Sequence, residues 1–419
     1  MTTPEVDNAR LWSSLMTLSE VGRYTDERTG LLGVNRLALT DADKAGRDLV
    51  KTWFEQAGLT VRVDRIGNVY ARRAGRDDSL APVMAGSHID SVPTGGAFDG
   101  ALGVLAALEA VRSLNDAGAK TLRPIEIAFF TDEEGARFGT DMLGSAVAVG
   151  RITLQEAYSL CDETGTSVQQ ELSRIGYLGA AEERISPPHA YLECHVEQGP
   201  ILEAAGLDLG LVTGVQAISW QQLEIHGKSA HAGTTPMDLR KDAGLVASMI
   251  NLRMHEMATS GNYGQHMRAT MGRVSPVPNR VNIVPGKVVC TVDLRNPDDA
   301  SMARAEADLA NYFDELQQSH GVHIERRQTA RTDSVTFDAK VVAQVGQQMQ
   351  ALGYRHEPLQ SGAGHDAQEM ASLCATAMIF VPGQYEGISH NPREYSTPEA
   401  CARGANVLLR VMRNLADEA

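Results

Sequence analysis

Apolar positions follow two spacings in the first part of the chain, up to about residue 212. Short runs rich in β-branched and aromatic residues, such as 124–131 and 190–196, predict buried strands. The long apolar run 101–118 has helical spacing, and 60–73 predicts a hairpin around a Gly-Asn turn. Alternating strands and helices predict an α/β sheet with helices packed on it.

The pattern changes between about residues 213 and 331. Strands are predicted at 215–227, 267–275, 287–296 and 321–332, and helices at 238–258 and 301–320. The resulting order β-α-β-β-α-β is that of a ferredoxin-like domain. From about residue 332, alternating helices and strands of the α/β type are predicted again. The sequence therefore predicts a discontinuous α/β domain, 1–212 with 332–419, into which a ferredoxin-like domain, 213–331, is inserted.

Length and charge limit the number of domains and the kinds of partner that the protein is expected to have. A chain of 419 residues fits two domains, and a net charge of −15 argues against nucleic acid or an anionic membrane as partner. The amino-terminal residues lack a basic region followed by an apolar one, and the most apolar run, 101–111, is too short to cross a bilayer. The 5 cysteines form no CxxC motif, which suits reduced thiols. We therefore expect a cytoplasmic protein that acts on a small molecule.

Histidines and carboxylates stand where four of the predicted sheet strands end. In open α/β sheets ligands bind at the carboxyl ends of strands. One such residue is usually a turn or capping residue, but four corresponding strand ends favour a shared site. Imidazoles with carboxylates bind divalent transition metals, and a carboxylate that can bridge favours two ions. The residues are His88, Asp90, Asp99, Asp132, Glu133, Glu134, His195, Glu197 and His390.

Several motifs resemble one known family. They are GSHIDSVPTGGAFDGALGV, FTDEEGARFGTDMLGS, HVEQGPILE, GKSAHAGTTPMDLRKDA, RVNIVPGKV, SGAGHDA and EGISHNPREY. Together they resemble the co-catalytic metallo-aminoacylase and carboxypeptidase family. HVEQGP and HAGTTPM resemble most closely its branch of N-carbamoyl-L-amino acid hydrolases, allantoate amidohydrolases and β-ureidopropionases. The likeness extends over most of the chain, including the inserted domain.

The resemblance implies a centre with two divalent ions per subunit, Zn²⁺ or alternatively Mn²⁺, Co²⁺ or Ni²⁺. It makes Asp99 the bridging ligand and Glu133 the general base, and it implies a cis peptide after Asp99. Asp90 is expected to orient a ligating imidazole, since such a ring commonly donates its second N–H to a carboxylate. The implied terminal ligands are His88, Glu134, His195 and His390.

The inserted domain matches further residues of the family. The resemblance implies that Arg295 grips the substrate carboxylate and that His231 stabilises the oxyanion from a partner subunit. Without the resemblance, an ion pair of Arg295 with Asp298 or Asp299 and a turn-capping role for His231 are equally acceptable interpretations. The other substrate-binding residues implied are Gln198, Asn282 and His365.

The resemblance implies hydrolysis of a linear amide, the carbamoyl C–N bond of an N-carbamoyl-L-amino acid. Allantoate and N-carbamoyl-β-amino acids are alternatives within the branch, and an N-acyl-amino acid deacylase or aminopeptidase is a more remote one. A non-catalytic binding relative is disfavoured because Glu133 and all the ligand residues are present. The family also implies a homodimer formed through residues 213–331.

Overall fold

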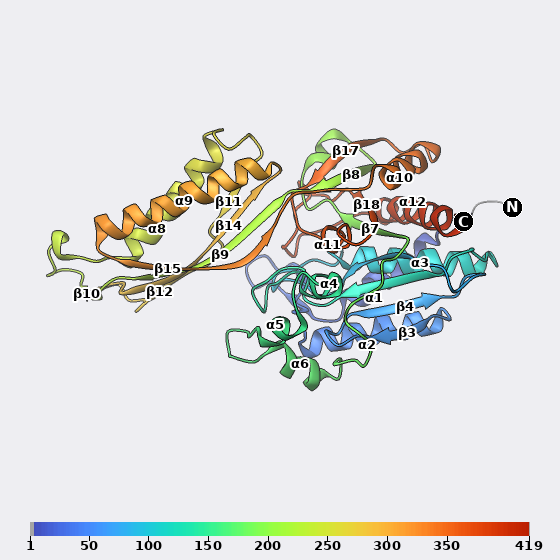
Figure 1. Cartoon of the computed structure of the whole chain (residues 1–419), viewed down its shortest axis with the longest axis horizontal. Coiled ribbons are helices and arrows are strands. Elements are labelled where there is room, and N and C mark those ends of the chain that lie inside the picture. Colours follow the sequence, from blue (N-terminus) through green and yellow to red (C-terminus); the bar gives the residue numbers. More distant parts are fainter. Residues whose placement is uncertain (1–3, 419) are drawn as a thin grey trace. The chain divides into compact units, whose positions relative to one another are not determined.

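A computed structural model describes residues 4–418, and the chain divides into two compact units. The first unit comprises Met1–Gly214 and Thr336–Ala419, and the second is Val215–Val335. Figure 1 shows the order of their elements along the chain. Within the described part of the chain, no helix is both long and apolar enough to span a bilayer.

The first unit is built on a mixed nine-stranded sheet. Its strand order is β16-β8-β18-β7-β5-β6-β4-β3, and β17 pairs with β8. The central strands β6, β5, β7 and β18 are mutually parallel and almost fully buried, as expected for strands covered on both faces. The predicted α/β class is confirmed. The strand bounds are β3 Thr60–Val63, β4 Val69–Arg73, β5 Val83–His88, β6 Ile125–Phe130, β7 Ala190–Val196, β8 Leu209–Val215, β16 Val335–Thr336, β17 His356–Ser361 and β18 Ala375–Val381.

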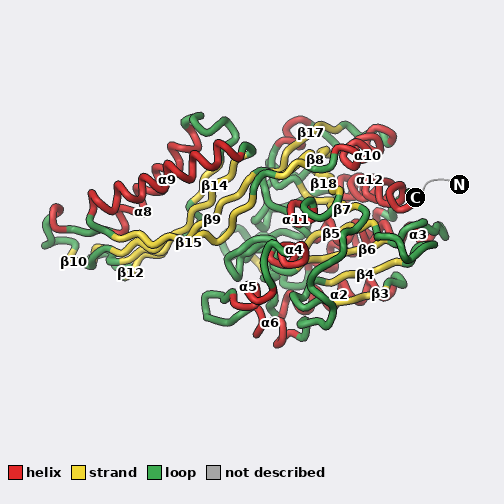
Figure 2. Tube along the Cα trace, in the orientation of Figure 1, coloured by secondary structure: helices red, strands yellow, loops and turns green. Residues whose placement is uncertain are grey.

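Helices pack against this sheet and against one another (Figure 2). The helix predicted from the run 101–118 is α3, Ala101–Asp116, which is buried nearly all round because β5, α1 and α12 pack on it. A hydrophobic helix of this kind belongs in the core of a large domain. The other helices are α1 Asn8–Ser19, α2 Asp41–Gln56, α4 Leu143–Val149, α5 Leu154–Ser159, α6 Val168–Ile175, α7 Ile201–Ala205, α10 Ala339–Ala351, α11 Asp366–Met370 and α12 Pro398–Asp417; β1 Arg23–Thr25 and β2 Leu32–Val34 form a small antiparallel ladder.

The second unit is an antiparallel sheet of order β11-β14-β9-β15, with β12 also on β14. Alternate residues of β9 and β14 are buried, and they share a core with α8 and α9, which lie on the same face of the sheet (Figure 1). The strand predicted at 267–275 is divided into β11 and β12, because between Thr270 and Val274 three residues stand opposite two residues of β14 and the regular pairing is interrupted. The bounds are β9 Ala217–His226, β10 Ala230–His231, α8 Ala243–Thr259, β11 Arg268–Thr270, β12 Val274–Val277, β13 Ile283–Val284, β14 Lys287–Asn296, α9 Asp299–His320 and β15 His323–Thr332, with η1 at Met237–Leu239.

Candidate functional site

The predicted metal ligands converge at one edge of the nine-stranded sheet. His88 ends β5, His195 lies near the end of β7, and Glu134 follows β6. Asp99 lies in the loop before α3, and His390 lies in the loop after β18. Because β5, β6, β7 and β18 are parallel neighbours, their carboxyl ends meet at the same edge. Residues from five separate segments therefore reach one place.

Asp99 joins two groups of potential ligands. Its Oδ1 lies 3.2 Å from Nε2 of His195 and 3.7 Å from Nε2 of His88. Its Oδ2 lies 3.4 Å from Nε2 of His390, which is 3.2 Å from Oε2 of Glu134. Each group offers three ligand atoms that lie close enough together for one metal ion.

The spacing of these atoms fits divalent transition metals. Ligand bonds of about 2.0–2.1 Å in a tetrahedral site put the ligand atoms about 3.3 Å from one another. The ligand-atom separations from 3.2 to 3.7 Å agree with that geometry. The residues present therefore fit a pair of ions, with one oxygen of Asp99 available to each.

Backbone carbonyls orient both buried imidazoles. Nδ1 of His88 lies 3.1 Å from the carbonyl oxygen of Asp90, and Nδ1 of His195 lies 2.9 Å from that of Val196. When Nδ1–H donates to these oxygens, each Nε2 keeps a lone pair, and that of His195 accepts the backbone N–H of Gly100 at 3.0 Å. The sequence predicted the carboxylate of Asp90 in this role, but that group is 3.7 Å from His88.

The carboxylate of Asp90 instead holds the segment that carries the paired glutamates. Its Oδ1 accepts the backbone N–H of Glu133 at 3.3 Å, and its Oδ2 accepts that of Glu134 at 3.4 Å. Burial raises the pKa of Asp90 to about 7. Asp90 thus links the end of β5 to the loop after β6.

The adjacent glutamates face different groups. Oε2 of Glu133 lies 3.4 Å from Nε2 of His88, whereas Oε2 of Glu134 lies beside His390. Burial, together with the negative charges of Asp366 and Glu134, raises the pKa of Glu133 well above its ordinary value. A buried carboxyl group with a raised pKa is suited to proton transfer.

The cluster carries an excess of negative charge. Partial desolvation of His390, whose side chain is 49% exposed, would lower its pKa, but the charges and hydrogen bonds of Glu134 and Asp99 raise it to about 11. Burial likewise opposes protonation of His195, and the Asp99 carboxylate outweighs it to raise that pKa to about 9. An electrostatic field that favours protonated rings also favours a bound cation.

A tight turn follows Asp99. The resemblance implied a cis peptide there, which the structure contradicts: within residues 4–418, Val277–Pro278 is the one cis bond. Gly100 adopts φ 64° and ψ −50°, and the N–H of Ala101 donates to the carbonyl of Asp99 at 2.6 Å, which defines a γ-turn. This turn redirects the chain into α3 with trans bonds. A Cβ at Gly100 would lie 2.4 Å from the ring of His88, so the close approach also requires glycine.

Two predicted substrate-binding residues lie beside the cluster. Nε2 of Gln198 donates to Oδ2 of Asp99 at 2.8 Å. The ring of His365 is buried 4.5 Å from the ring of His195, and its Nε2 lies 2.9 Å from Oγ of Ser361. The first unit therefore brings together nine of the predicted residues, which are His88, Asp90, Asp99, Glu133, Glu134, His195, Gln198, His365 and His390.

His231 and Asn282 lie side by side in the second unit. Strand β10 pairs with β13, and the N–H of Ala232 donates to the carbonyl of Asn282 at 3.0 Å. Nδ1 of His231 accepts the N–H groups of Gly233 and Thr234 at 3.0 and 3.2 Å. The neutral ring therefore carries its proton on Nε2, and the exposed side chain presents a hydrogen-bond donor.

Arg295 lies near the carboxyl end of β14, in the ladder that β14 forms with β9 in the second unit. It is paired with Ile218 on β9, and its guanidinium forms an ion pair with Asp293 at 2.9 Å. The alternative partners considered from the sequence have other contacts: Asp298 caps α9, and Asp299 binds Ser334. The structure therefore separates Arg295 from His231 within one unit.

Sequence reasoning missed two residues that contact Asp99, namely Ser389 and Glu394. Oγ of Ser389 lies 2.6 Å from Oδ2 of Asp99, and Oε1 of Glu394 accepts the N–H of Asp99 at 3.1 Å. The signal available in the sequence was their position in the motif around His390.

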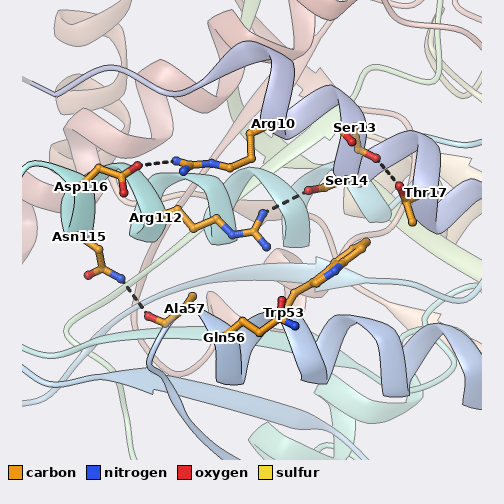
Figure 3. Close-up of a pocket in the computed structure, with 10 residues that line it drawn as sticks. All are labelled: Arg10, Ser13, Ser14, Thr17, Trp53, Gln56, Ala57, Arg112, Asn115 and Asp116. Atoms are coloured by element: carbon orange, nitrogen blue, oxygen red, sulfur yellow. Dashed lines mark hydrogen bonds and ion pairs between the residues drawn. The ribbon is translucent and has the colours of Figure 1, made fainter.

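A separate cavity of about 570 Å³ lies among α1, α2 and α3 (Figure 3). Arg112, Asn115 and Asp116 line it near the carboxyl end of α3. The metal-ligand cluster adjoins the opposite end of this 16-residue helix, which is roughly 24 Å long. The cavity is therefore distinct from the cluster. Its lining residues are Arg10, Ser13, Ser14, Thr17, Trp53, Gln56, Ala57, Arg112, Asn115 and Asp116.

Comparisons with known proteins agree with this geometry. The family model described as "Peptidase family M20/M25/M40" matches residues 84–414. An N-carbamoyl-L-amino-acid amidohydrolase of Rhizobium meliloti is 43% identical over 417 residues, 98% of this chain and 97% of that protein. An allantoate amidohydrolase of Bacillus subtilis (strain 168) is 32% identical over 390 residues, 92% of this chain and 93% of the relative.

A solved structure is similar over the whole chain. It is an amidase of the hydantoinase/carbamoylase family from Burkholderia vietnamiensis, with a TM-score of 0.95 and 43% identity over 100% of both chains. These matches confirm the resemblance drawn from the motifs and the expectation of a hydrolytic enzyme.

Proposed function

The chain belongs to peptidase family M20/M25/M40, and from this premise we propose that it hydrolyses the carbamoyl C–N bond of N-carbamoyl-L-amino acids. Water is consumed, and the products are the amino acid, CO₂ and ammonia. The observation that carries the proposal is the position of Asp99 between two groups of ligands, with Glu133 beside them. The identity of 43% to an N-carbamoyl-L-amino-acid amidohydrolase supports this substrate class.

The proposed centre binds two divalent ions. Asp99 would be shared by both ions, His88 and His195 would hold one of them, and Glu134 and His390 would hold the other. Bound ions of this kind polarise a carbonyl group and lower the pKa of water.

Glu133 is the proposed general base. It accepts a proton from the attacking water and later donates that proton to the leaving nitrogen. The burial that raises its pKa makes Glu133 a stronger base, which favours the first of these transfers. Asp90 fixes the direction of Glu133 by binding its backbone N–H.

Residues of the second unit are proposed to bind and polarise the substrate. The guanidinium of Arg295 recognises the substrate carboxylate through a bidentate pair of hydrogen bonds. Nε2–H of His231 stabilises the negative charge that develops on the attacked carbonyl oxygen. Gln198, Asn282 and His365 supply further polar contacts.

His231 is proposed to serve the site of a second copy. Strand β14 has 10 residues and is roughly 30 Å long. Arg295 is its penultimate residue, whereas His231 lies on the separate β10–β13 ladder, which comes just before the start of β14. One copy of this unit therefore does not bring both side chains to one small substrate.

Exposed apolar residues support a homodimer formed through residues 213–331. Leu245 and Leu252 are 45% and 59% exposed on α8, and their seven-residue spacing puts them on one face of the helix. Val274 and Val277 are each 53% exposed on β12. Burying such side chains against a second copy is favourable, and twofold dimers are the commonest soluble assemblies.

A substrate panel tests the proposal. The metal-loaded protein is assayed with N-carbamoyl, N-acetyl and N-formyl derivatives of L-α-amino acids, an N-carbamoyl-β-amino acid, and allantoate. We expect the highest kcat/KM with an N-carbamoyl-L-α-amino acid. Preference for allantoate, the substrate class named for the Bacillus subtilis relative, would replace the proposed substrate. Preference for N-acetyl derivatives would identify a deacylase with the same metal centre.

A further inference from the structure

Glu394 holds the loop that carries Asp99. Its Oε1 accepts the backbone N–H of Phe98 at 2.8 Å and that of Asp99 at 3.1 Å. Only 8% of Glu394 is exposed, so these bonds are shielded from water. A buried carboxylate that accepts two backbone N–H groups fixes the path of the chain at this point.

The second oxygen of Glu394 reaches the side chain of Asp99 through Ser389. Oγ of Ser389 lies 2.6 Å from Oε2 of Glu394 and 2.6 Å from Oδ2 of Asp99. This Oδ2 is the oxygen that faces His390. Glu394 therefore contacts the backbone of Asp99 directly and its carboxylate through one hydroxyl group.

The two loops involved are packed tightly together. A Cβ at Gly96 would lie 2.4 Å from Cβ of Glu394. The loop before Asp99 can therefore lie this close to Glu394 only because residue 96 is glycine. Oγ1 of Thr94 also donates to the carbonyl of His390 at 3.0 Å. The loop after β18 thus carries one potential ligand, His390, and the groups that position another.

We infer that Glu394, acting with Ser389, is a positioning residue that sets the orientation of the Asp99 carboxylate. Glu394 is not among the potential ligands, so its effect reaches the ions only through Asp99. A bridging carboxylate must direct one oxygen to each ion, and rotation about its side-chain bonds would lose one of them. The inference rests on the metal centre proposed above and adds residues that determine its affinity.

The test measures metal affinity in the full-length protein by competition with a chromogenic chelator, using Zn²⁺ and Co²⁺. Glu394→Ala is expected to weaken binding by about 10–100-fold, the usual effect of losing a group that orients a ligand. Glu394→Gln should bind nearly as well as the native protein, because its carbonyl accepts the same N–H groups and its amide donates to Ser389. Ser389→Ala should also weaken binding, and the effects of Ser389→Ala and Glu394→Ala should not add.

Glu109 provides a matched control in the same unit. Its buried carboxylate accepts the backbone N–H of Asp7 at 3.0 Å and the hydroxyl of Ser113 at 3.2 Å, and it lies in the second half of α3. Glu109→Ala should lower the melting temperature and leave metal affinity unchanged. An equal loss of affinity in Glu109→Ala would assign the Glu394 effect to general destabilisation and overturn the inference.

The remaining outcomes are also decisive. Native affinity in Glu394→Ala overturns the inference, and if that variant does not fold, native affinity in Ser389→Ala overturns it instead. A native protein that binds two ions tightly but hydrolyses no carbamoyl amino acid refutes the proposed substrate and leaves this inference intact. A native protein that binds no metal refutes the metal centre itself.

Discussion

Nε2 of His195 lies 3.2 Å from Oδ1 of Asp99, although the two residues lie in different parts of the chain. His195 belongs to a buried parallel strand, and Asp99 belongs to a loop that leads into the central helix. Because Oδ1 of Asp99 faces His195, its other oxygen, Oδ2, faces His390. This division of one carboxylate is the geometry expected for two neighbouring cations.

Removing metal should abolish activity. We expect dialysis against a chelator to eliminate turnover and Zn²⁺, Mn²⁺, Co²⁺ or Ni²⁺ to restore it, because imidazole and carboxylate ligands select weakly among these ions. Elemental analysis should give two ions per native chain and fewer in Asp99→Asn. Full activity in protein shown to be metal-free would refute the metal centre.

The adjacent glutamates should differ in their effects. Glu133→Gln should lower kcat by about 10²–10⁴-fold, the range for a lost general base, with metal content near normal. Glu134→Gln should lower metal content as well, because Glu134 faces His390 and lies in the second ligand group. Steady-state kinetics and elemental analysis of both variants check this. Near-native turnover by Glu133→Gln would mean that another group is the base.

Arg295 should be sensitive to a conservative change. Arg295→Lys is expected to raise KM, since an ammonium group cannot form the bidentate pair with a carboxylate. The matched substrate is the amide analogue, which has no carboxylate and should be hydrolysed equally by the native protein and the variant. Equal losses on the acid and the amide would assign Arg295 a structural role, such as its ion pair with Asp293.

Mixed dimers should show whether His231 acts across subunits. Homodimers of His231→Ala and of Glu133→Gln are both expected to be nearly inactive, since losing one oxyanion donor costs about 10²–10³-fold in kcat. Mixed dimers of the two variants should recover up to about half the native activity, because one of the two sites then has both groups.

The control for that experiment places both substitutions on one chain. Mixed dimers of the native chain with the double variant should be inactive if His231 serves the partner's site. If they instead keep half the native activity, and the mixed single variants recover none, then His231 acts within its own chain.

Asp64 should make stability depend on pH. Its buried carboxylate accepts the N–H groups of Ile66 and Asn68 at 3.0 and 2.8 Å, and burial raises its pKa to about 7. The folded protein therefore keeps a proton that the unfolded chain releases near pH 4. The protonated Asp64 therefore contributes to the free energy of unfolding, and this contribution is fully present below about pH 4. It decreases by up to about 1.4 kcal/mol per pH unit and is lost as the pH rises through about 7.

Asp64→Asn removes this titration. Melting temperatures of the chelator-treated native protein and the variant are compared from pH 4.5 to 8. As the pH rises, the melting temperature of the native protein should fall relative to that of the variant. Parallel curves would show that Asp64 is ionised across this range in the folded protein.

The apolar pattern alone was sufficient to predict the central elements. The runs that became β6 and β7 are short and apolar because both faces of these parallel strands are buried, and the run that became α3 is buried on nearly all sides. These signals are local. The positions of His88, Glu134, His195 and His390 relative to their strands were therefore also readable from the sequence.

The tertiary structure decided how the side chains are directed. Only packing of distant segments shows that Glu133 faces His88, that Asp90 holds a neighbouring backbone, and that Glu394 contacts Asp99. Each of these contacts depends on side-chain rotation and on loops whose sequence has no periodicity. Hydrophobic spacing determines which segments become strands, but the order of the strands and the directions of the polar groups at their ends are determined by hydrogen bonds and packing that form only when the whole sheet is assembled.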